Sequence, residues 1–250
     1  MSPATHTISR DRFDAVLFDL DGVITATASV HAAAWKQMFD AFLRARAQEQ
    51  GEPCVPFDTG HDYEQYVDGK RRYDGVQSFL ESRGIELPHG EPSDAATART
   101  VCGLGNRKNE LIGEVLASQG VDVFEGTIAL VHQLRALGIK TAVVSSSENA
   151  KTMLESAGIQ DLFDLRIDGR VASELQLPGK PAPDTFLFAA KRLGVEPARA
   201  VVVEDAIAGV QAGRDGGFGL VVGVDRVGRP ESLSDNGADV VVADLSEMLS

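Results

Sequence analysis

The chain has 250 residues, of which 43% are hydrophobic and 24% charged, so it can bury the core of one large domain or two modest ones. Its 24 lysine and arginine residues against 37 aspartate and glutamate residues give a formal net charge of −13. This acidity argues against a broad basic surface for nucleic acid or anionic lipid. An anionic substrate would need a metal ion or a few placed cations.

The amino terminus, MSPATHTISRDRFD, lacks the apolar core of a signal peptide, and no apolar run approaches the roughly 18 residues of a membrane span. We therefore expect a cytoplasmic protein, monomeric and not bound to a membrane. Cys54 and Cys102 have no CxxC spacing, which favours free thiols over a disulfide or a zinc site.

The first predicted strand, Val16 to Phe18 in the stretch VLFDLDGVIT, leads directly to Asp19 and Asp21. Taken alone, an Asp-Gly pair after a strand is an ordinary turn. However, residues i and i+2 of an extended segment point to the same side, so the two carboxylates would lie close together at the carboxyl end of the strand. They repel each other unless a cation neutralises them or one keeps its proton.

Residues 29–117 are predicted to be helical, from SVHAAAWKQMFDAFLRARA through DGVQSFLESRG to NRKNELIGEVLASQG, with a loop at GEPCVPFDTG. No convincing buried strand interrupts this pattern. It indicates a helical domain inserted after the first core strand.

From residue 120 onward, β-branched runs alternate with helical segments that end on glycine. This alternation predicts an α/β domain whose parallel sheet is covered by helices on both faces. We therefore expect a core domain of residues 1–28 and 118–250 and a helical domain of residues 29–117. The later predicted strands of the core are 139–145, 165–168, 200–205, 218–224 and 239–243.

Polar residues mark three further positions in this domain. Ser145 to Ser147 follow a strand and either cap the next helix or hold an anion near its amino terminus. In LPGKPAPDTF, three prolines and a glycine stiffen a loop around Lys180, which is either an exposed turn lysine or a fixed positive charge. The strand in VVVEDAIAGV ends on Glu204 and Asp205, acids that a helix dipole also favours.

Each feature has an ordinary explanation, but together they gather at the carboxyl edge of one sheet, where such sheets bind ligands. Asp19, Asp21 and Asp205 would repel one another there unless they bound a hard cation. Oxygen ligands of this kind suit Mg²⁺. A lysine and hydroxyl groups beside the ion would complete a phosphoryl-binding site.

The motifs DLDGV, VVSSS, GKPAPD and VVVED resemble, in order and spacing, the four motifs of the haloacid dehalogenase superfamily of phosphotransferases. The resemblance narrows to the β-phosphoglucomutase-like branch. There the first motif is followed by a threonine, a histidine and a tryptophan, and the cap contains GxxR and RKN segments. It implies a Rossmann-like parallel-sheet core with an inserted α-helical cap. The matching positions are Thr27, His31, Trp35, Gly69 to Arg72, and 107–109.

The resemblance implies a role for each acid of the core. Asp19 would be the nucleophile that forms an aspartyl-phosphate, and Asp21 the acid/base that protonates the leaving oxygen and deprotonates the incoming one. The Asp19 carboxylate, the Asp21 backbone carbonyl and Asp205 would hold Mg²⁺, with Glu204 assisting.

The resemblance also implies a set of substrate contacts. Ser145, Ser146 and Lys180 would bind the transferring phosphoryl group, and Ser145 and Lys180 would complete the catalytic set. Ala26 stands where relatives often have aspartate, and Glu148 where the best-known mutases have lysine, so the contacts to the sugar and its non-reacting phosphate remain open. The cap members of the set are also compatible with ordinary interface residues and solvated charges. The predicted substrate-binding residues are Thr27, His31, Trp35, Gly69, Arg72, Lys108, Ser146, Ser147 and Asn149.

The expected function is a Mg²⁺-dependent mutase that interconverts β-D-glucose 1-phosphate and glucose 6-phosphate through an aspartyl-phosphate and a bisphosphate intermediate. One alternative is a sugar-phosphate phosphatase of the same fold, in which water takes the phosphoryl group from Asp19. Another is a non-catalytic phosphosugar-binding module, although a binder would not need the acid Asp21. The sequence leaves the sugar and its anomer open.

Overall fold

The computed structural model describes residues 7–249 and contains two compact units. One unit comprises the described residues up to Ala26 together with those from Val121 onward, and the other is Thr27–Gly120. This division lies two and three residues from the boundaries at 28/29 and 117/118 that the sequence suggests. No helix in residues 7–249 is long and apolar enough to cross a membrane.

The first unit, the core, is built on one parallel six-stranded sheet in the order β3-β2-β1-β4-β5-β6. The middle strands β1 and β4 are fully buried, as their continuous apolar sequences require for a sheet covered on both faces. All six predicted strands are confirmed. Their bounds are β1 Ala15–Phe18, β2 Lys140–Val144, β3 Leu165–Ile167, β4 Ala200–Glu204, β5 Leu220–Val224 and β6 Val240–Val242.

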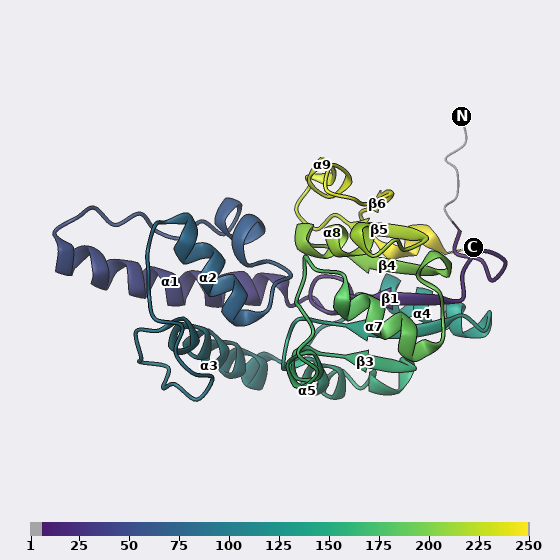
Figure 1. Ribbon diagram of the computed structural model, residues 1–250. Helices are drawn as coiled ribbons and strands as arrows, with labels where there is room; N and C mark the ends of the chain where they lie inside the picture. Colours follow the sequence, from purple (N-terminus) through teal and green to yellow (C-terminus); the bar gives the residue numbers. More distant parts are fainter. Residues whose placement is uncertain (1–6, 250) are drawn as a thin grey trace. The chain divides into compact units, whose positions relative to one another are not determined.

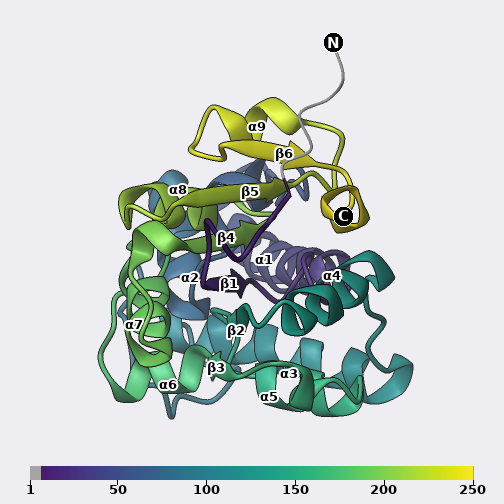
Figure 2. The same ribbon diagram turned by 90° about the vertical axis from the view of Figure 1, so that its right-hand side faces the viewer.

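Helices cover both faces of this sheet (Figures 1 and 2). The helices α7 and α8 pack on one face, where Leu17 and Val202 meet Phe186, and α4 lies on the other. The four core helices expected from glycine-terminated segments are confirmed as α4, α5, α7 and α8. The core helices are α4 Glu125–Ala136, α5 Ala150–Ser156, α6 Gly169–Glu174, α7 Asp184–Leu193, α8 Ile207–Asp215 and α9 Pro230–Ser234, with short 3₁₀ turns at Gln160–Leu162, Pro197–Arg199 and Leu245–Met248.

The second unit, the cap, is helical and contains no strand between Thr27 and Gly120. An aromatic cluster forms its centre: the ring of Phe39 lies 5.4 Å from Trp35 and 4.1 Å from Phe79, centroid to centroid. Residues 85–100 form turns and loops where the sequence suggests helix, because Pro88 and Pro92 interrupt the segment. The cap helices are α1 Ala28–Gln50, a π-helical turn Tyr63–Val67, α2 Arg72–Ser82 and α3 Val101–Gln119.

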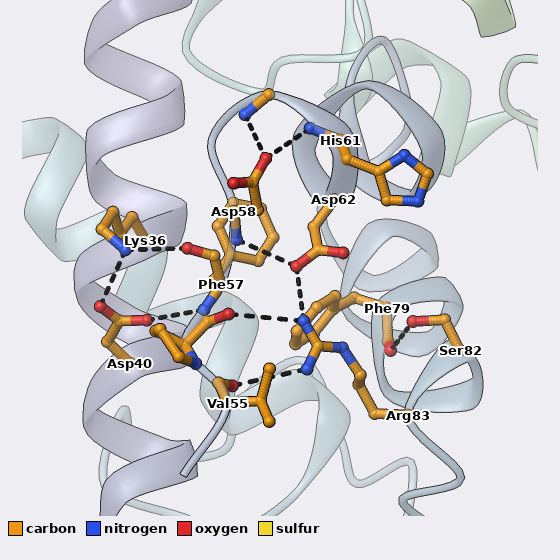
Figure 3. A network of polar contacts seen from close by, with 12 residues as sticks. Lys36, Asp40, Val55, Phe57, Asp58, His61, Asp62, Phe79, Ser82 and Arg83 are labelled. Carbon is orange, nitrogen blue, oxygen red and sulfur yellow. Dashed lines mark hydrogen bonds and ion pairs between the residues drawn. The ribbon is translucent and has the colours of Figure 1, made fainter.

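Polar contacts hold the long loop after α1 against the cap helices (Figure 3). The buried Asp40 carboxylate on α1 accepts a hydrogen bond from the Phe57 backbone N–H at 2.8 Å. Arg83, at the end of α2, pairs with the Asp62 carboxylate at 2.6 Å and also donates to loop carbonyls. These bonds satisfy backbone groups that have no helix or strand partner. In the loop and on α3, Cys54 and Cys102 are free cysteines, as predicted.

Candidate active site

The site is at the carboxyl edge of the core sheet, where the strand order reverses between β1 and β4. The register pairs Phe18 with Val203, and the Asp19 N–H donates to the Val203 carbonyl at 2.9 Å. Asp19 therefore leaves β1 beside Glu204, the last residue of β4. In open α/β sheets this reversal leaves a crevice in which ligands bind.

Lys180 joins the two acids. Its Nζ lies 2.5 Å from Asp19 Oδ1, 2.5 Å from Glu204 Oε1 and 3.1 Å from the Val144 carbonyl oxygen, so three acceptors match the three donors of an ammonium group. Burial alone would lower the pKa of Lys180, but the negative charges of Asp19 and Glu204 outweigh it and raise that pKa. Lys180 is therefore a permanently charged, buried residue and not an exposed turn lysine.

Glu204 is fully buried and tightly held. While Oε1 faces Lys180, Oε2 accepts hydrogen bonds from the backbone N–H groups of Asp205 and Ala206, each at 3.0 Å. Gly209 on α8 leaves room for this carboxylate, because a Cβ there would come within 1.9 Å of it. Burial raises the pKa of Glu204, and the nearby Asp19 charge adds to that rise, whereas Lys180 opposes it.

The carboxylates form a group able to hold a metal ion. Ligand oxygens of Asp19, Glu204 and Asp205 lie within 4.8 Å of one another. With Lys180 they leave an excess of two negative charges when all are ionised. A divalent cation that prefers oxygen ligands, such as Mg²⁺, therefore fits both the donor atoms and the charge.

The turn after Asp21 brings Asp205 to the same place. Gly22 adopts φ +86°, and a Cβ on it would lie 1.7 Å from Asp205 Oδ2, so the carboxylate rests on the glycine backbone. The Asp21 side chain is not a member of the described carboxylate group. The regular strand ends at Phe18, and Asp21 lies beyond it in an isolated bridge to Thr25, so the strand geometry assumed for Asp19 and Asp21 does not extend to the second acid.

The serines after β2 form successive tight turns. The buried Ser145 Oγ accepts a hydrogen bond from the Ser147 N–H at 3.0 Å, and Ser147 Oγ accepts one from the Asn149 N–H at 3.2 Å. Asn149 is the N-cap position of α5, but its side chain makes no capping hydrogen bond. Ser146 is partly exposed between the two turns. Phosphoryl binding by these residues stays a prediction.

In the cap, the structure brings together three predicted substrate-binding residues. Lys108 on α3 is buried; its Nζ lies 3.0 Å from His31 Nδ1 and 4.8 Å from the centre of the Trp35 ring. Burial first, and then the charge of Lys108, lowers the pKa of His31 well below its ordinary value. His31 is therefore neutral near pH 7, and Nδ1 accepts from the ammonium group.

The other predicted cap residues lie on different elements. Arg72, the first residue of α2, stacks on the Tyr73 ring and donates to the Tyr73 hydroxyl at 3.1 Å. Gly69 has φ +69° in the turn before α2, and Thr27 is buried at the N-cap of α1. Their contacts with substrate stay predictions.

The sequence interpretation missed two residues that touch the Asp21 turn. Thr127 on α4 donates from its hydroxyl to the Val23 carbonyl at 2.6 Å, and Arg226 donates from Nε to the Gly22 carbonyl at 2.7 Å. Arg226 follows β5 by two residues, at the same edge as the other site residues. That position is a signal available in the sequence, since the carboxyl ends of all parallel strands meet there.

Comparison with known proteins gives the family. A model of haloacid dehalogenase-like hydrolases matches residues 13–217. The chain belongs to this family. It is 51% identical to a β-phosphoglucomutase from Mycobacterium tuberculosis, over 96% of this chain and 92% of the relative. A β-phosphoglucomutase from Bacillus subtilis is 34% identical, with 94% and 91% of the two chains covered.

A solved structure agrees with the sequence relatives. The β-phosphoglucomutase of Clostridium difficile superposes with a TM-score of 0.73 at 28% identity, covering 94% of this chain and 93% of that one. The resemblance drawn from the four motifs and the α/β fold class are therefore confirmed, and the chain is a phosphotransferase enzyme of the haloacid dehalogenase-like family.

Proposed function

We propose that the protein is a Mg²⁺-dependent phosphosugar mutase that interconverts β-D-glucose 1-phosphate and glucose 6-phosphate. The observation that carries the proposal is the group formed by the buried residues Asp19, Lys180 and Glu204 with the partly buried Asp205 at the sheet reversal. The name of relatives that match nearly the whole chain supports the choice of substrate. A cytoplasmic location, a monomeric state and the absence of nucleic-acid partners stay predictions.

In the first half-reaction an Asp19 carboxylate oxygen attacks one phosphorus of a sugar bisphosphate, which leaves aspartyl-phosphate and a sugar monophosphate. A bond from that oxygen to phosphorus forms, the bond from phosphorus to the sugar oxygen breaks, and Asp21 gives a proton to the leaving oxygen. Lys180 already lies at hydrogen-bond distance from Asp19, so its charge sits next to the phosphoryl group as this group is transferred.

In the second half-reaction a free hydroxyl of a bound sugar monophosphate, the substrate, attacks the aspartyl-phosphate. Asp21 takes the proton of that hydroxyl, the bond to Asp19 breaks, and a bisphosphate forms. After the sugar reorients, Asp19 accepts the other phosphoryl group and the isomeric monophosphate is released. Mg²⁺, held by Asp19, Asp205 and the Asp21 carbonyl with Glu204 assisting, would offset the negative charge between nucleophile and phosphate.

The cap would supply the cations that the acidic chain otherwise lacks for a second phosphate. Lys108 is buried beside neutral His31, and Arg72 is oriented by the Tyr73 ring and hydroxyl. Ordering of both charges before substrate binds lowers the entropy lost on binding. We therefore assign the non-reacting phosphate to Arg72 and Lys108. Thr27, Trp35, Gly69, Ser146, Ser147 and Asn149 complete the proposed substrate contacts, beside the phosphoryl contacts of Ser145.

The test is turnover of β-glucose 1-phosphate with and without a catalytic amount of glucose 1,6-bisphosphate, with glucose 6-phosphate and free phosphate measured separately. We expect glucose 6-phosphate as the main product, dependent on Mg²⁺ and stimulated by the bisphosphate. Free glucose and phosphate as the main products would overturn the mutase assignment and support a sugar-phosphate phosphatase, the alternative that the hydrolase description of the family favours.

A further inference from the structure

The turn from Leu20 to Thr25 carries the proposed acid and a proposed backbone ligand, and it is neither helix nor regular strand. Its conformation is fixed by hydrogen bonds to its carbonyl groups. The Gly22 N–H closes the turn by donating to the Thr25 carbonyl at 2.8 Å. From outside the turn, Thr127 donates to Val23, the Phe124 N–H to Ile24, and Arg226 to Gly22.

Arg226 is the charged member of this set. Its Nε donates to the Gly22 carbonyl at 2.7 Å, and Nη1 donates to the Ala243 carbonyl at 3.2 Å. The guanidinium carbon lies 3.5 Å from the centre of the Phe124 ring, which holds the plane of the group in place. Asp244 Oδ2 is 3.9 Å from Nη1, and 17% of the Arg226 side chain is exposed.

A contribution to stability alone does not explain the position of Arg226. Its charge is partly buried, and Nη2 is buried without a hydrogen-bond partner among residues 7–249, an arrangement that costs folding free energy. Asp205 and Asp244 are the acids whose charges act on it most. Asp205 in turn rests on Gly22, the residue whose carbonyl Arg226 holds.

We propose that Arg226 is a positioning residue that fixes the orientation of the Gly22 peptide. Through this peptide it sets the direction of the Asp21 backbone carbonyl and the position of the Asp205 carboxylate. The inference rests on the proposed function, since it assigns these two groups to the metal ion. It adds a residue outside the four motifs to the machinery of the reaction. Groups that hydrogen-bond to the residues around a metal ion set the orientation of its ligands.

The experiment compares Arg226→Gln, which removes the charge and the fork of donors, with Arg226→Lys, which keeps the charge alone. Arg214→Gln is the matched control, because Arg214 is an exposed arginine on α8 of the core unit and pairs with Asp215. Titration calorimetry with MgCl₂ on metal-free protein measures the affinity for the ion. Amide hydrogen exchange of residues 20–25 in metal-free protein measures the order of the turn.

We expect Arg226→Gln to weaken Mg²⁺ binding about tenfold and to lower kcat by about tenfold, with KM for the sugar phosphate within about twofold of wild type. Exchange of the Gly22, Ile24 and Thr25 amides should quicken. Arg226→Lys should recover only part of each loss, because an ammonium group lacks the planar fork that reaches the Gly22 and Ala243 carbonyls from a position over the Phe124 ring. Arg214→Gln should match wild type.

The opposite result is clearly distinguishable. If Arg226 acted only through its positive charge near Asp205, it would repel Mg²⁺, and its removal would strengthen binding of the ion. If Arg226→Gln binds Mg²⁺ as tightly as wild type or more tightly, or if the amides of the turn exchange as before, the positioning role is wrong. Should Arg226→Gln fail to fold, Arg226→Lys and Phe124→Leu decide by the same measurements. A wild-type protein without mutase turnover would instead refute the proposed function, while the exchange data would still decide the role of Arg226.

Discussion

Replacing Lys180, which pairs with the buried acids Asp19 and Glu204, should cost stability, and Mg²⁺ should reduce that cost. Lys180→Met keeps the apolar stem but leaves Asp19 and Glu204 facing each other; their side chains are 9% and 0% exposed. Removing one partner of a buried ion pair typically costs about 3–5 kcal/mol. We expect a loss in that range in the free energy of unfolding, measured in EDTA near pH 8.

Mg²⁺ should restore part of this stability, because it takes the place of the missing charge. At a concentration about 100 times its dissociation constant, a ligand of the folded state adds about 2.7 kcal/mol. Neutralising one of the two acids should also restore stability, because only a single buried carboxylate is then left without its partner. We therefore expect Lys180→Met with Glu204→Gln to be more stable in EDTA than Lys180→Met alone.

Urea denaturation followed by far-ultraviolet circular dichroism is the assay. Because the single tryptophan, Trp35, lies in the cap, its fluorescence reports on that unit separately. Arg99→Met, which breaks the exposed pair between Arg99 and Glu49, is the control and should change stability by no more than about 0.5 kcal/mol. If Lys180→Met loses less than about 1 kcal/mol in EDTA, the burial argument for the site is refuted.

Three further predictions concern the reaction and the cap. Asp19→Asn should abolish turnover and phosphoenzyme formation with the fold intact, because an amide is no nucleophile; a phosphoenzyme trapped with fluoride and Mg²⁺ on the variant would contradict the assignment. Arg72→Ala should depress the mutase reaction far more than hydrolysis of a small aryl phosphate, which has no second phosphate, at about 1.4 kcal/mol per tenfold fall; equal losses would mean that Arg72 supports the fold. The pKa of the His31 imidazole in NMR spectra should lie below that of a free imidazole, and Lys108→Met should raise it. Since this pKa lies below that of the unfolded chain, His31 should contribute stability that is present above about pH 6.5 and lost as the pH falls. Titration of His31 near pH 6.5 in the wild type would contradict its burial.

The sequence was sufficient to predict which residues lie at the carboxyl edge of the sheet, because each motif there is a short continuous segment. A buried run followed by an acid or a serine identifies the end of a strand, and the carboxyl ends of parallel strands gather at one edge of the sheet. The strand order and register that put Asp19 beside Glu204 come from the structure. The ion pairs of Lys180 are different. They join residues 161 and 24 positions away in the chain, along a loop whose path depends on the packed core, so the sequence left the lysine between an exposed turn and a fixed charge.

The cap was less predictable for the same reason. Its long helices follow from amphipathic periodicity, but the contact between His31 and Lys108 spans 77 residues and depends on how α1 and α3 pack. The loop of residues 85–100 carries its own hydrogen bonds, such as Thr100 Oγ1 to Asp94 at 2.6 Å, which compete with helix formation beside Pro88 and Pro92. Helical composition alone does not reveal that competition.

The charge balance of the site is the reason for proposing both a metal ion and cap cations. Asp19, Glu204 and Asp205 against Lys180 leave an excess of two negative charges, which one divalent ion cancels. A second phosphate on the substrate brings about two more, in a chain whose net charge is already −13. An exposed ion pair in water gives only about 1 kcal/mol at 4 Å, so distant surface lysines cannot hold that group. The proposed binding of a bisphosphate therefore calls for ordered cations, and the Lys108 ammonium, which is buried beside His31, is more ordered than a solvated lysine would be.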